Sequence, residues 1–424
     1  MDRKKIIFTT ILGNIFEAYD LLVFGLMINY LKILFLPDYE GITLSLLGFL
    51  LFSVGYAARP VGAYFLGKIG DEQSRKKSIT YSILLLTIST FCIGLLPTYS
   101  SIGIFSTIIL TILRLIQHFS VSIELIGGSL FLIESFPENQ RYLVNSFMFS
   151  SSYIGAILGL VVILIINYML DSTAILNWGW RIPFLLSLPL GLITAYLRIK
   201  LSESPQFIKF KKNSLSNNKD KTLSMKEILS NKKIDLVYVT GIFVSFSISL
   251  YISLIYIPNI LQASSLFANS QAYIITITNY FMIFIFTVIF GYLAKNNNNI
   301  GTKILKFSLV STIWLAVPIY LLLNSMNITG MLLAQIISSI LLSMQASTTL
   351  ATIVNNFEFN TKYSFLNLGL NFSMAIFGGS APFVIAYLSQ IIHPLAPAFY
   401  IAITALFTLG CIKKTLNNKI TCSY

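Results

Sequence analysis

Long apolar runs alternate with short polar segments along almost the whole chain of 424 residues. A helix needs about 20 mostly apolar residues to cross the ~30 Å hydrocarbon core of a bilayer, and these runs have that length. The pattern therefore predicts an all-α integral membrane protein with twelve transmembrane helices. The predicted spans cover residues 6–30, 44–66, 78–96, 102–132, 144–169, 179–198, 234–258, 271–294, 304–323, 328–355, 363–389 and 396–412.

One polar segment is much longer than the others. Residues 199–233 contain the string KKNSLSNNKDK and separate the sixth predicted span from the seventh. The chain is therefore expected to form two six-helix domains, 1–198 and 234–424, joined by a cytoplasmic connector over 199–233. The lysines of this connector either form a solvated loop or contact anionic lipid.

Composition and charge support a membrane protein and indicate its orientation. The chain is 55% hydrophobic and only 11% charged, whereas soluble domains carry about 25% charged residues. The net charge of +13 would suggest a nucleic-acid partner in a soluble protein. Here most Lys and Arg residues fall in alternate polar segments, and the positive-inside rule accounts for them. The rule places both termini in the cytoplasm, and no nucleic-acid partner is expected.

The first predicted span carries two carboxylates, Glu17 and Asp20. At 1.5 Å per residue, Glu17 lies about 16 Å from Ile6, near the centre of the bilayer. A charged side chain at that depth costs on the order of 3 kcal/mol or more in contact with lipid. Residues three apart share one helix face, so this face is expected to line a transport pathway. Asn14 and Tyr19 are expected to bring hydrogen-bonding groups close to the two carboxylates.

Arg114 is predicted to lie at the same depth as Glu17, because it is about 18 Å into the fourth span from Ile102. Opposite charges at one depth offset each other's desolvation. We therefore expect Arg114 either to pair with the carboxylates or to bind a substrate carboxylate. Glu124 lies nearer the cytoplasmic end of the span, as either a proton site or an interhelical ion pair. Protonation of Glu17 or Asp20 would shift the balance between two states that differ in proton affinity.

Several strings along the chain carry a family resemblance. They include GNxxExYD (Gly13 to Asp20), GxxGDxxxRK (Gly67 to Lys76), RLIQxFS (Arg114 to Ser120), ExxPxxxR (Glu134 to Arg141) and FGGSAP (Phe377 to Pro382). The chain resembles the major facilitator superfamily over nearly its whole length. Within it, the chain is most similar to metabolite:proton symporters such as bacterial proline/betaine osmolyte transporters. The resemblance implies two pseudo-symmetric six-helix bundles that rock about a central site.

The resemblance also implies a charge network that closes the cytoplasmic end. Its residues would be Gly67, Gly70, Asp71, Arg75, Glu134 and Arg141. The glycines would allow tight helix ends and turns, and Asp71 would pair with Arg75 or Arg141. The alternative is that the basic residues only determine topology. In the second half, Asn296 to Asn299 stand where the resemblance implies an Asp–Arg pair, so a matching second network is not expected.

Three further polar residues have candidate roles. Arg59 precedes Pro60 and is expected to end the straight part of the second span. His118 lies one turn from Arg114, where the resemblance implies glycine, and either fills space or relays protons. His393 is expected in an outer loop. The chain has only these two histidines and three scattered cysteines. Because they show no metal-ligand spacing and no nucleophile–base pair, we predict no metal, no cofactor and no enzymatic activity.

The sequence therefore predicts a symporter of a bacterial inner membrane that imports a small polar metabolite with protons. The expected partners are the substrate, the proton as coupling ion and the lipid bilayer, and a monomer is sufficient. A zwitterion such as proline or betaine fits a site that offers both a carboxylate and Arg114. The alternatives are a di- or tricarboxylate such as 2-oxoglutarate, or a sensor that no longer transports.

Overall fold

The computed structural model describes residues 3–36, 39, 41–205, 207–208, 233–263, 269–325, 327–355 and 362–418. The helices of the first half are α1 (Arg3–Phe35), α2 (Gly41–Val54), η1 (Gly55–Ala58), α3 (Arg59–Glu72), α4 (Arg75–Leu95), α5 (Tyr99–Ile102), α6 (Ile104–Val121), α7 (Glu124–Ser135), η2 (Glu138–Gln140), α8 (Arg141–Met169), α9 (Ser172–Asn177), η3 (Gly179–Arg181), α10 (Ile182–Leu185) and α11 (Ser187–Ile199). Those of the second half are α14 (Lys233–Tyr251), η4 (Ile252–Tyr256), α15 (Ile257–Ala263), α16 (Asn269–Leu293), α17 (Asn298–Leu323), α18 (Ile328–Val354), α19 (Lys362–Ser373), η6 (Met374–Gly378), α20 (Ala381–Tyr387), η7 (Leu388–Ile392) and α21 (Ala396–Asn418).

Within the described ranges, eleven helices are long and apolar enough to cross a membrane. The remaining predicted span, 44–66, is present as α2 and α3 with the 3₁₀ turn η1 between them. Pro60 lies in the first turn of α3 and has no backbone N–H, so it cannot continue the hydrogen bonding of α2. A Cβ added at Gly55 would overlap the ring of His118, so glycine lets η1 approach α6. The break brings Arg59 into the interior, where it is 3% exposed.

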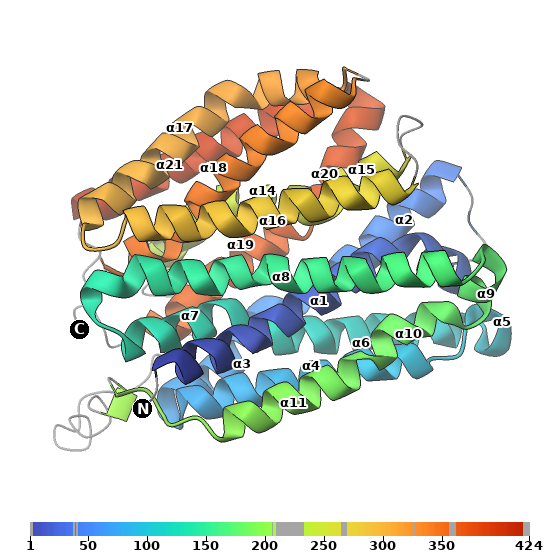
Figure 1. The fold of residues 1–424 in the computed structure, drawn as a ribbon, viewed down its shortest axis with the longest axis horizontal. Coiled ribbons are helices and arrows are strands. Elements are labelled where there is room, and N and C mark those ends of the chain that lie inside the picture. The colour runs from blue at the N-terminus through green and yellow to red at the C-terminus, as the bar shows by residue number, and fades with distance from the viewer. Residues whose placement is uncertain are drawn as a thin grey trace.

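The helices of the two chain halves form two groups, as Figure 1 shows by the separation of blue and green from yellow and red. Helix α8 lies at the boundary, where it packs against α1 on one side and against α16 and α18 on the other. Helix α3 packs against α19, and η1 packs against η6. Most of the predicted connector at 199–233 lies outside the described residues, so the domain boundaries stay a prediction.

Both described chain ends lie at the same end of the molecule, on the left in Figure 1. Arg3 there lies 5.9 Å from the ring centroid of Phe136. The backbone N–H of Asn296 donates to the backbone carbonyl of Asn139 at 3.0 Å, and this bond joins the two halves. We call this end the basic end, because Arg3, Arg75, Arg141 and Lys295 belong to it.

Many large apolar side chains are exposed on the outer faces of the helices. Trp314 is 78% exposed, Phe105 66% and Ile403 66%. Extended apolar surface of this kind marks contact with a membrane or a partner. The interior, in contrast, contains buried charged side chains, and two of them, Arg114 and Arg198, are among the largest fully buried residues. The polar chemistry of the protein therefore lies inside the helix bundle, as the sequence predicts.

Candidate functional site

Glu17 and Asp20 both point into the protein interior, in agreement with the prediction from their depth. The side chain of Glu17 is 12% exposed and Asp20 is 4% exposed. Oε1 of Glu17 lies 3.1 Å from Nη2 of Arg59 in α3. The ion-pair partner of Glu17 is therefore Arg59, and the expected pairing with Arg114 was wrong. Oε2 of Glu17 has no hydrogen-bond partner among the described residues, so this oxygen is available to a proton or a ligand.

Asp20 is connected to Arg114 through a glutamine. Oδ1 of Asp20 accepts hydrogen bonds from Oγ1 of Thr90 at 2.7 Å and from Nε2 of Gln117 at 2.9 Å. Oε1 of Gln117 accepts from Nη1 of Arg114 at 2.9 Å. The guanidinium of Arg114 also lies 3.7 Å from the ring centroid of Phe24. The ion pairs of the described residues do not include Arg114, so this buried cation contacts neutral groups.

His118 lies between the two arginines. Its Nδ1 is 3.2 Å from Nε of Arg59, and its Nε2 is 2.8 Å from Nη2 of Arg114. Guanidinium nitrogens only donate, and a neutral imidazole has one acceptor nitrogen, so at most one of these contacts is a hydrogen bond. The ring thus joins the two cations instead of only filling space. We call the following residues the central cluster: Glu17, Asp20, Arg59, Arg114, Gln117 and His118.

The central cluster contacts the second half of the chain. Nη1 of Arg59 lies 3.1 Å from Sδ of Met374, which begins the π-helical turn η6. The rings of Tyr56 and Tyr251 meet edge to face with centroids 5.2 Å apart. A Cβ added at Gly379 would overlap the ring of Tyr56, so the FGGSAP string packs closely against η1. Single π-helical turns occur frequently at functional sites, and this one lies where the charge of the cluster meets the other half.

Two residues predicted to lie beside the carboxylates instead attach α1 to its neighbours. Nδ2 of Asn14 donates to the carbonyl of Met148 and to Oγ of Ser151, each at 2.8 Å, in α8. The hydroxyl of Tyr19 donates to the carbonyl of Pro183 at 2.7 Å. Neither side chain is hydrogen-bonded to Glu17 or Asp20 in the described structure, and a role of Asn14 and Tyr19 at the site stays a prediction.

Glu124 forms an interhelical ion pair, which was one of its two predicted roles. Oε2 of Glu124 accepts from Nη1 of Arg198 at 2.8 Å, and both side chains are fully buried. Arg198 also donates to the backbone carbonyls of Ile79 at 2.7 Å and Thr10 at 3.2 Å. The pairing of Arg198, the last residue of the predicted span 179–198, is not predicted from the sequence. The available signal was its position in the last turn of an apolar run, where a buried cation needs a partner such as Glu124.

The predicted charge network is present at the basic end. Asp71 pairs with Arg75, and Nη2 of Arg75 lies 3.7 Å from Oε1 of Glu134. Asp71 also accepts a hydrogen bond from the hydroxyl of Ser364 in α19. This last contact joins the two halves of the chain at the basic end.

The two glycines of this network do not end a helix. Gly67 and Gly70 lie inside α3, which continues to Glu72, so the expectation of helix ends and turns was wrong. A Cβ at Gly67 would lie 3.1 Å from Oγ of Ser364. Gly67 therefore allows α3 to pack closely against α19.

Arg141 makes a separate set of contacts and does not pair with Asp71. Its Nη2 lies 2.8 Å from Oε1 of Glu138, and its Nη1 donates to Oδ1 of Asn355 at 2.9 Å. Nδ2 of Asn355 donates to Oδ1 of Asn298 at 3.0 Å. The asparagine-rich loop of the second half thus supplies amide contacts in place of the charged pair that the resemblance implies.

A cavity of about 720 Å³ lies at the opposite end of the molecule. It is lined from both halves, by α1, α8 and α9 and by α15 and α16, and Nδ2 of Asn167 donates to the hydroxyl of Tyr273 across it at 3.2 Å. Asp171 lies in its wall, where bonds from the backbone N–H of Ala174 and the hydroxyl of Thr173 lower the pKa of its carboxyl. Small-molecule sites measure about 300–1,000 Å³, so this cavity is large enough for a metabolite.

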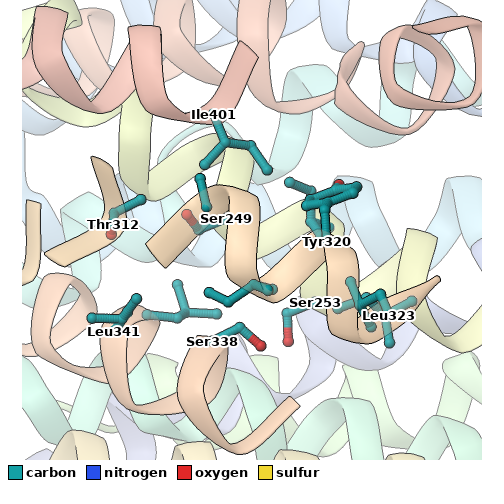
Figure 2. Close-up of a pocket in the computed structure, with 13 residues that line it drawn as sticks. Ser249, Ser253, Thr312, Tyr320, Leu323, Ser338, Leu341 and Ile401 are labelled. Carbon is teal, nitrogen blue, oxygen red and sulfur yellow. The ribbon is translucent and has the colours of Figure 1, made fainter. Parts of the chain in front are cut away.

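A second cavity, of about 60 Å³, lies within the second half. Figure 2 shows its mostly apolar wall together with the hydroxyl side chains of Ser249, Ser253, Thr312 and Ser338. Its volume is far below the roughly 300 Å³ of the smallest usual ligand sites. It is therefore too small to bind a transported metabolite in this conformation.

Comparison with known proteins identifies the family to which this fold belongs. Residues 6–217 match the family model described as "Sugar (and other) transporter". The glycine betaine/proline/ectoine/pipecolic acid transporter OusA of Dickeya dadantii (strain 3937) is 31% identical over 425 residues, which cover 98% of this chain and 84% of OusA. The chain belongs to the major facilitator superfamily. The proline/betaine transporter of Escherichia coli (strain K12) is another relative of this major facilitator protein, 30% identical over 427 residues, with 98% and 85% covered.

Solved structures agree with this assignment of the fold. The proton:xylose symporter XylE bound to 6-bromo-6-deoxy-D-glucose superimposes with a TM-score of 0.79 at 13% sequence identity, covering 98% of this chain and 96% of XylE. The predicted family and the predicted twelve-helix fold are therefore confirmed. The protein is a membrane-embedded, multi-pass transporter of small molecules and not an enzyme.

Proposed function

We propose that this transporter is a proton symporter for a small carboxylate-bearing zwitterion such as proline or glycine betaine. The names of the two relatives at about 30% identity support this substrate class. The observation that carries the proposal is the ion pair between Glu17 and Arg59, which is buried and contacts Met374 of the other half. A carboxylate in that position links proton binding to the contact between the halves.

Protonation of Glu17 is the coupling step in this proposal. A proton on Glu17 removes its negative charge and releases Arg59, which then takes the carboxylate of the solute as its new partner. When the solute leaves, Arg59 pairs again with Glu17 and the proton is lost. Proton and solute thus favour one another because each stabilises the same state of Arg59, and such coupling is reciprocal. Asp20, which reaches Arg114 through Gln117, is the second candidate proton site.

The basic end faces the cytoplasm of a bacterium, by the positive-inside rule, and the protein lies in the inner membrane. The contacts of Asp71, Arg75, Glu134 and Arg141 close that end while the cavity at the opposite end takes up solute. No cofactor takes part, the proton is the coupling ion, and one protomer is sufficient for transport.

Uptake into proteoliposomes tests this function. The full chain is reconstituted, and labelled proline, glycine betaine and 2-oxoglutarate are offered with and without an inward proton gradient. We expect the gradient to drive accumulation of a zwitterion, and Glu17→Gln to abolish accumulation while exchange of solute without a gradient persists. Glu72→Gln, a partly exposed glutamate of α3, is the matched control. Accumulation of 2-oxoglutarate alone would show that the substrate is a dicarboxylate and not a zwitterion. Uptake that does not depend on the gradient would refute the proton coupling.

A further inference from the structure

The two arginines of the central cluster carry more N–H donors than the groups around them can accept with strong hydrogen bonds. Arg114 is 1% exposed and donates to the neutral oxygen of Gln117 and, at 3.3 Å, to the backbone carbonyl of Phe52. Its Nε has no hydrogen-bond partner among the described residues. A buried guanidinium is stable only when it is paired and hydrogen-bonded. No carboxylate among the described residues contacts Arg114 directly, because Asp20 reaches it only through Gln117.

His118 adds to this shortage of hydrogen-bond acceptors. It faces Nε of Arg59 at 3.2 Å and Nη2 of Arg114 at 2.8 Å. A neutral imidazole accepts through one nitrogen and donates through the other, so it directs an N–H toward one of the two guanidinium groups. A carboxylate between these groups would remove the conflict, because it accepts from both arginines and from the imidazole N–H.

Met374 contributes a weak acceptor at the same place. Its Sδ lies 3.1 Å from Nη1 of Arg59, and a thioether sulfur is a poor partner for a charged donor. Methionine is also flexible, with an unbranched side chain that adapts to several packings. Because Met374 belongs to η6 in the second half, its sulfur can leave Arg59 when an anion arrives, and that movement takes place at the contact between the halves.

We propose that Arg59, Arg114 and His118 together bind the carboxylate of the transported solute, at the place that the thioether of Met374 holds in this structure. This rests on the proposed function and deepens it, because it names the group that is recognised and the residues that select for it. The site then discriminates carboxylates from amides and alcohols of the same shape. His118 is a selectivity residue of this site and not a proton relay.

A tethered carboxylate tests the position of the site. In Met374→Glu the carboxyl carbon Cδ takes the same position along the side chain as Sδ of methionine. Its oxygens therefore reach Arg59. Counterflow of labelled proline and glycine betaine in proteoliposomes is measured without a proton gradient. We expect Met374→Glu to have a half-saturation concentration on the order of tenfold or more above that of its neutral isostere Met374→Gln. Equal behaviour of the two variants would overturn the proposal.

Analogue pairs test the chemistry with variants that leave Met374 intact. Unlabelled proline is compared with prolinamide, and glycine betaine with choline, as competitors of the labelled solute. We expect only the carboxylates to compete in wild type, and His118→Ala to reduce the carboxylate preference by about tenfold. A packing defect would instead weaken both members of a pair equally. His393→Ala, which changes the exposed second histidine, is the matched control.

The outcomes separate this inference from the proposed coupling. Counterflow needs no proton gradient, so a failure of proton coupling leaves these competition ratios intact. Competition by prolinamide or choline as strong as that of the carboxylates would refute the carboxylate site. So would the absence of exchange of proline, glycine betaine and 2-oxoglutarate alike in the wild-type protein.

Discussion

Glu17 in α1 and Arg59 in α3 form an ion pair in the interior of the first half, with 3.1 Å between Oε1 and Nη2. Arg59 also contacts Met374 of the second half through its Nη1. One guanidinium therefore connects a buried carboxylate to the boundary between the halves. In the proposed mechanism, a proton on Glu17 would therefore weaken a contact at this boundary.

A double-mutant cycle measures this pair. Arg59→Gln leaves the carboxylate of Glu17 buried without a cation, and breaking a buried pair in this way costs about 3–5 kcal/mol. The double variant Glu17→Gln/Arg59→Gln removes both charges, so it should be more stable than Arg59→Gln alone. Thermal unfolding in detergent gives the stabilities of the wild type, the two single variants and the double variant. Additive effects of the two substitutions would contradict a direct pair.

The pair of Glu124 and Arg198 is expected to stabilise the first half without taking part in transport. Both side chains are fully buried, so Arg198→Met leaves an unpaired carboxylate and should destabilise the protein by about 3–5 kcal/mol. Glu124→Gln/Arg198→Met should recover part of that loss. Uptake by the folded double variant should keep its dependence on the proton gradient. Loss of the gradient dependence alone would show that Glu124 is a proton site.

Gly13 should tolerate no side chain. A Cβ there would overlap Nη2 of Arg198 and Oε1 of Glu124, so Gly13→Ala is expected to separate the ion pair and lower stability by about 3 kcal/mol or more. Gly410→Ala in α21 is the control, because no atom lies within 4 Å of its added Cβ. In a helix this exchange stabilises by about 0.5–1 kcal/mol. Thermal unfolding of both variants is measured to test this difference. Equal unfolding midpoints for Gly13→Ala and Gly410→Ala would contradict the packing at Gly13.

The contacts of Asp71 are expected to hold the basic end closed. Asp71→Asn removes the ion pair with Arg75 and weakens the bond from Ser364, and a loss of about 1.4 kcal/mol raises the open-to-closed ratio about tenfold. Spin labels at Asn139 and Asn296, whose backbones are hydrogen-bonded in this structure, report the separation in a cysteine-free background. Longer distances should become more populated. An unchanged distribution, equal to that of Glu72→Gln, would show that the network sets topology alone.

Helix depth was predictable from the sequence because it follows from counting 1.5 Å per residue. Glu17 and Arg114 indeed belong to one cluster. The rotation of each helix against its neighbours was not predictable, because it depends on packing between helices far apart in the sequence. For this reason the break of the helix near Arg59 is predictable from the sequence, but the pairing of Arg59 with Glu17 is not. Tyr19, two residues from Glu17, turned out to face α10.

The position of Arg198 shows a second limit. Its place at the end of an apolar run fits a cytoplasmic loop as well as a buried ion pair, and only the contact with Glu124 across α7 and α11 distinguishes them. The contacts of His118 with two arginines were also hidden, because they need the break at Gly55 that brings η1 against α6. The charged residues and the Asp71–Arg75 pair, four residues apart, were thus predictable from the sequence, whereas the partners of Glu17 and Glu124 on distant helices were not.

The coupling of solute entry to proton entry is tested most directly by measuring both in the same vesicles. A pH-sensitive dye is trapped inside proteoliposomes, and solute is added at equal pH on both sides. We expect proline or glycine betaine to acidify the lumen with the wild-type protein but not with Glu17→Gln. Solute that enters the wild-type vesicles without any acidification would contradict the role of the Glu17–Arg59 pair as the proton-coupling element.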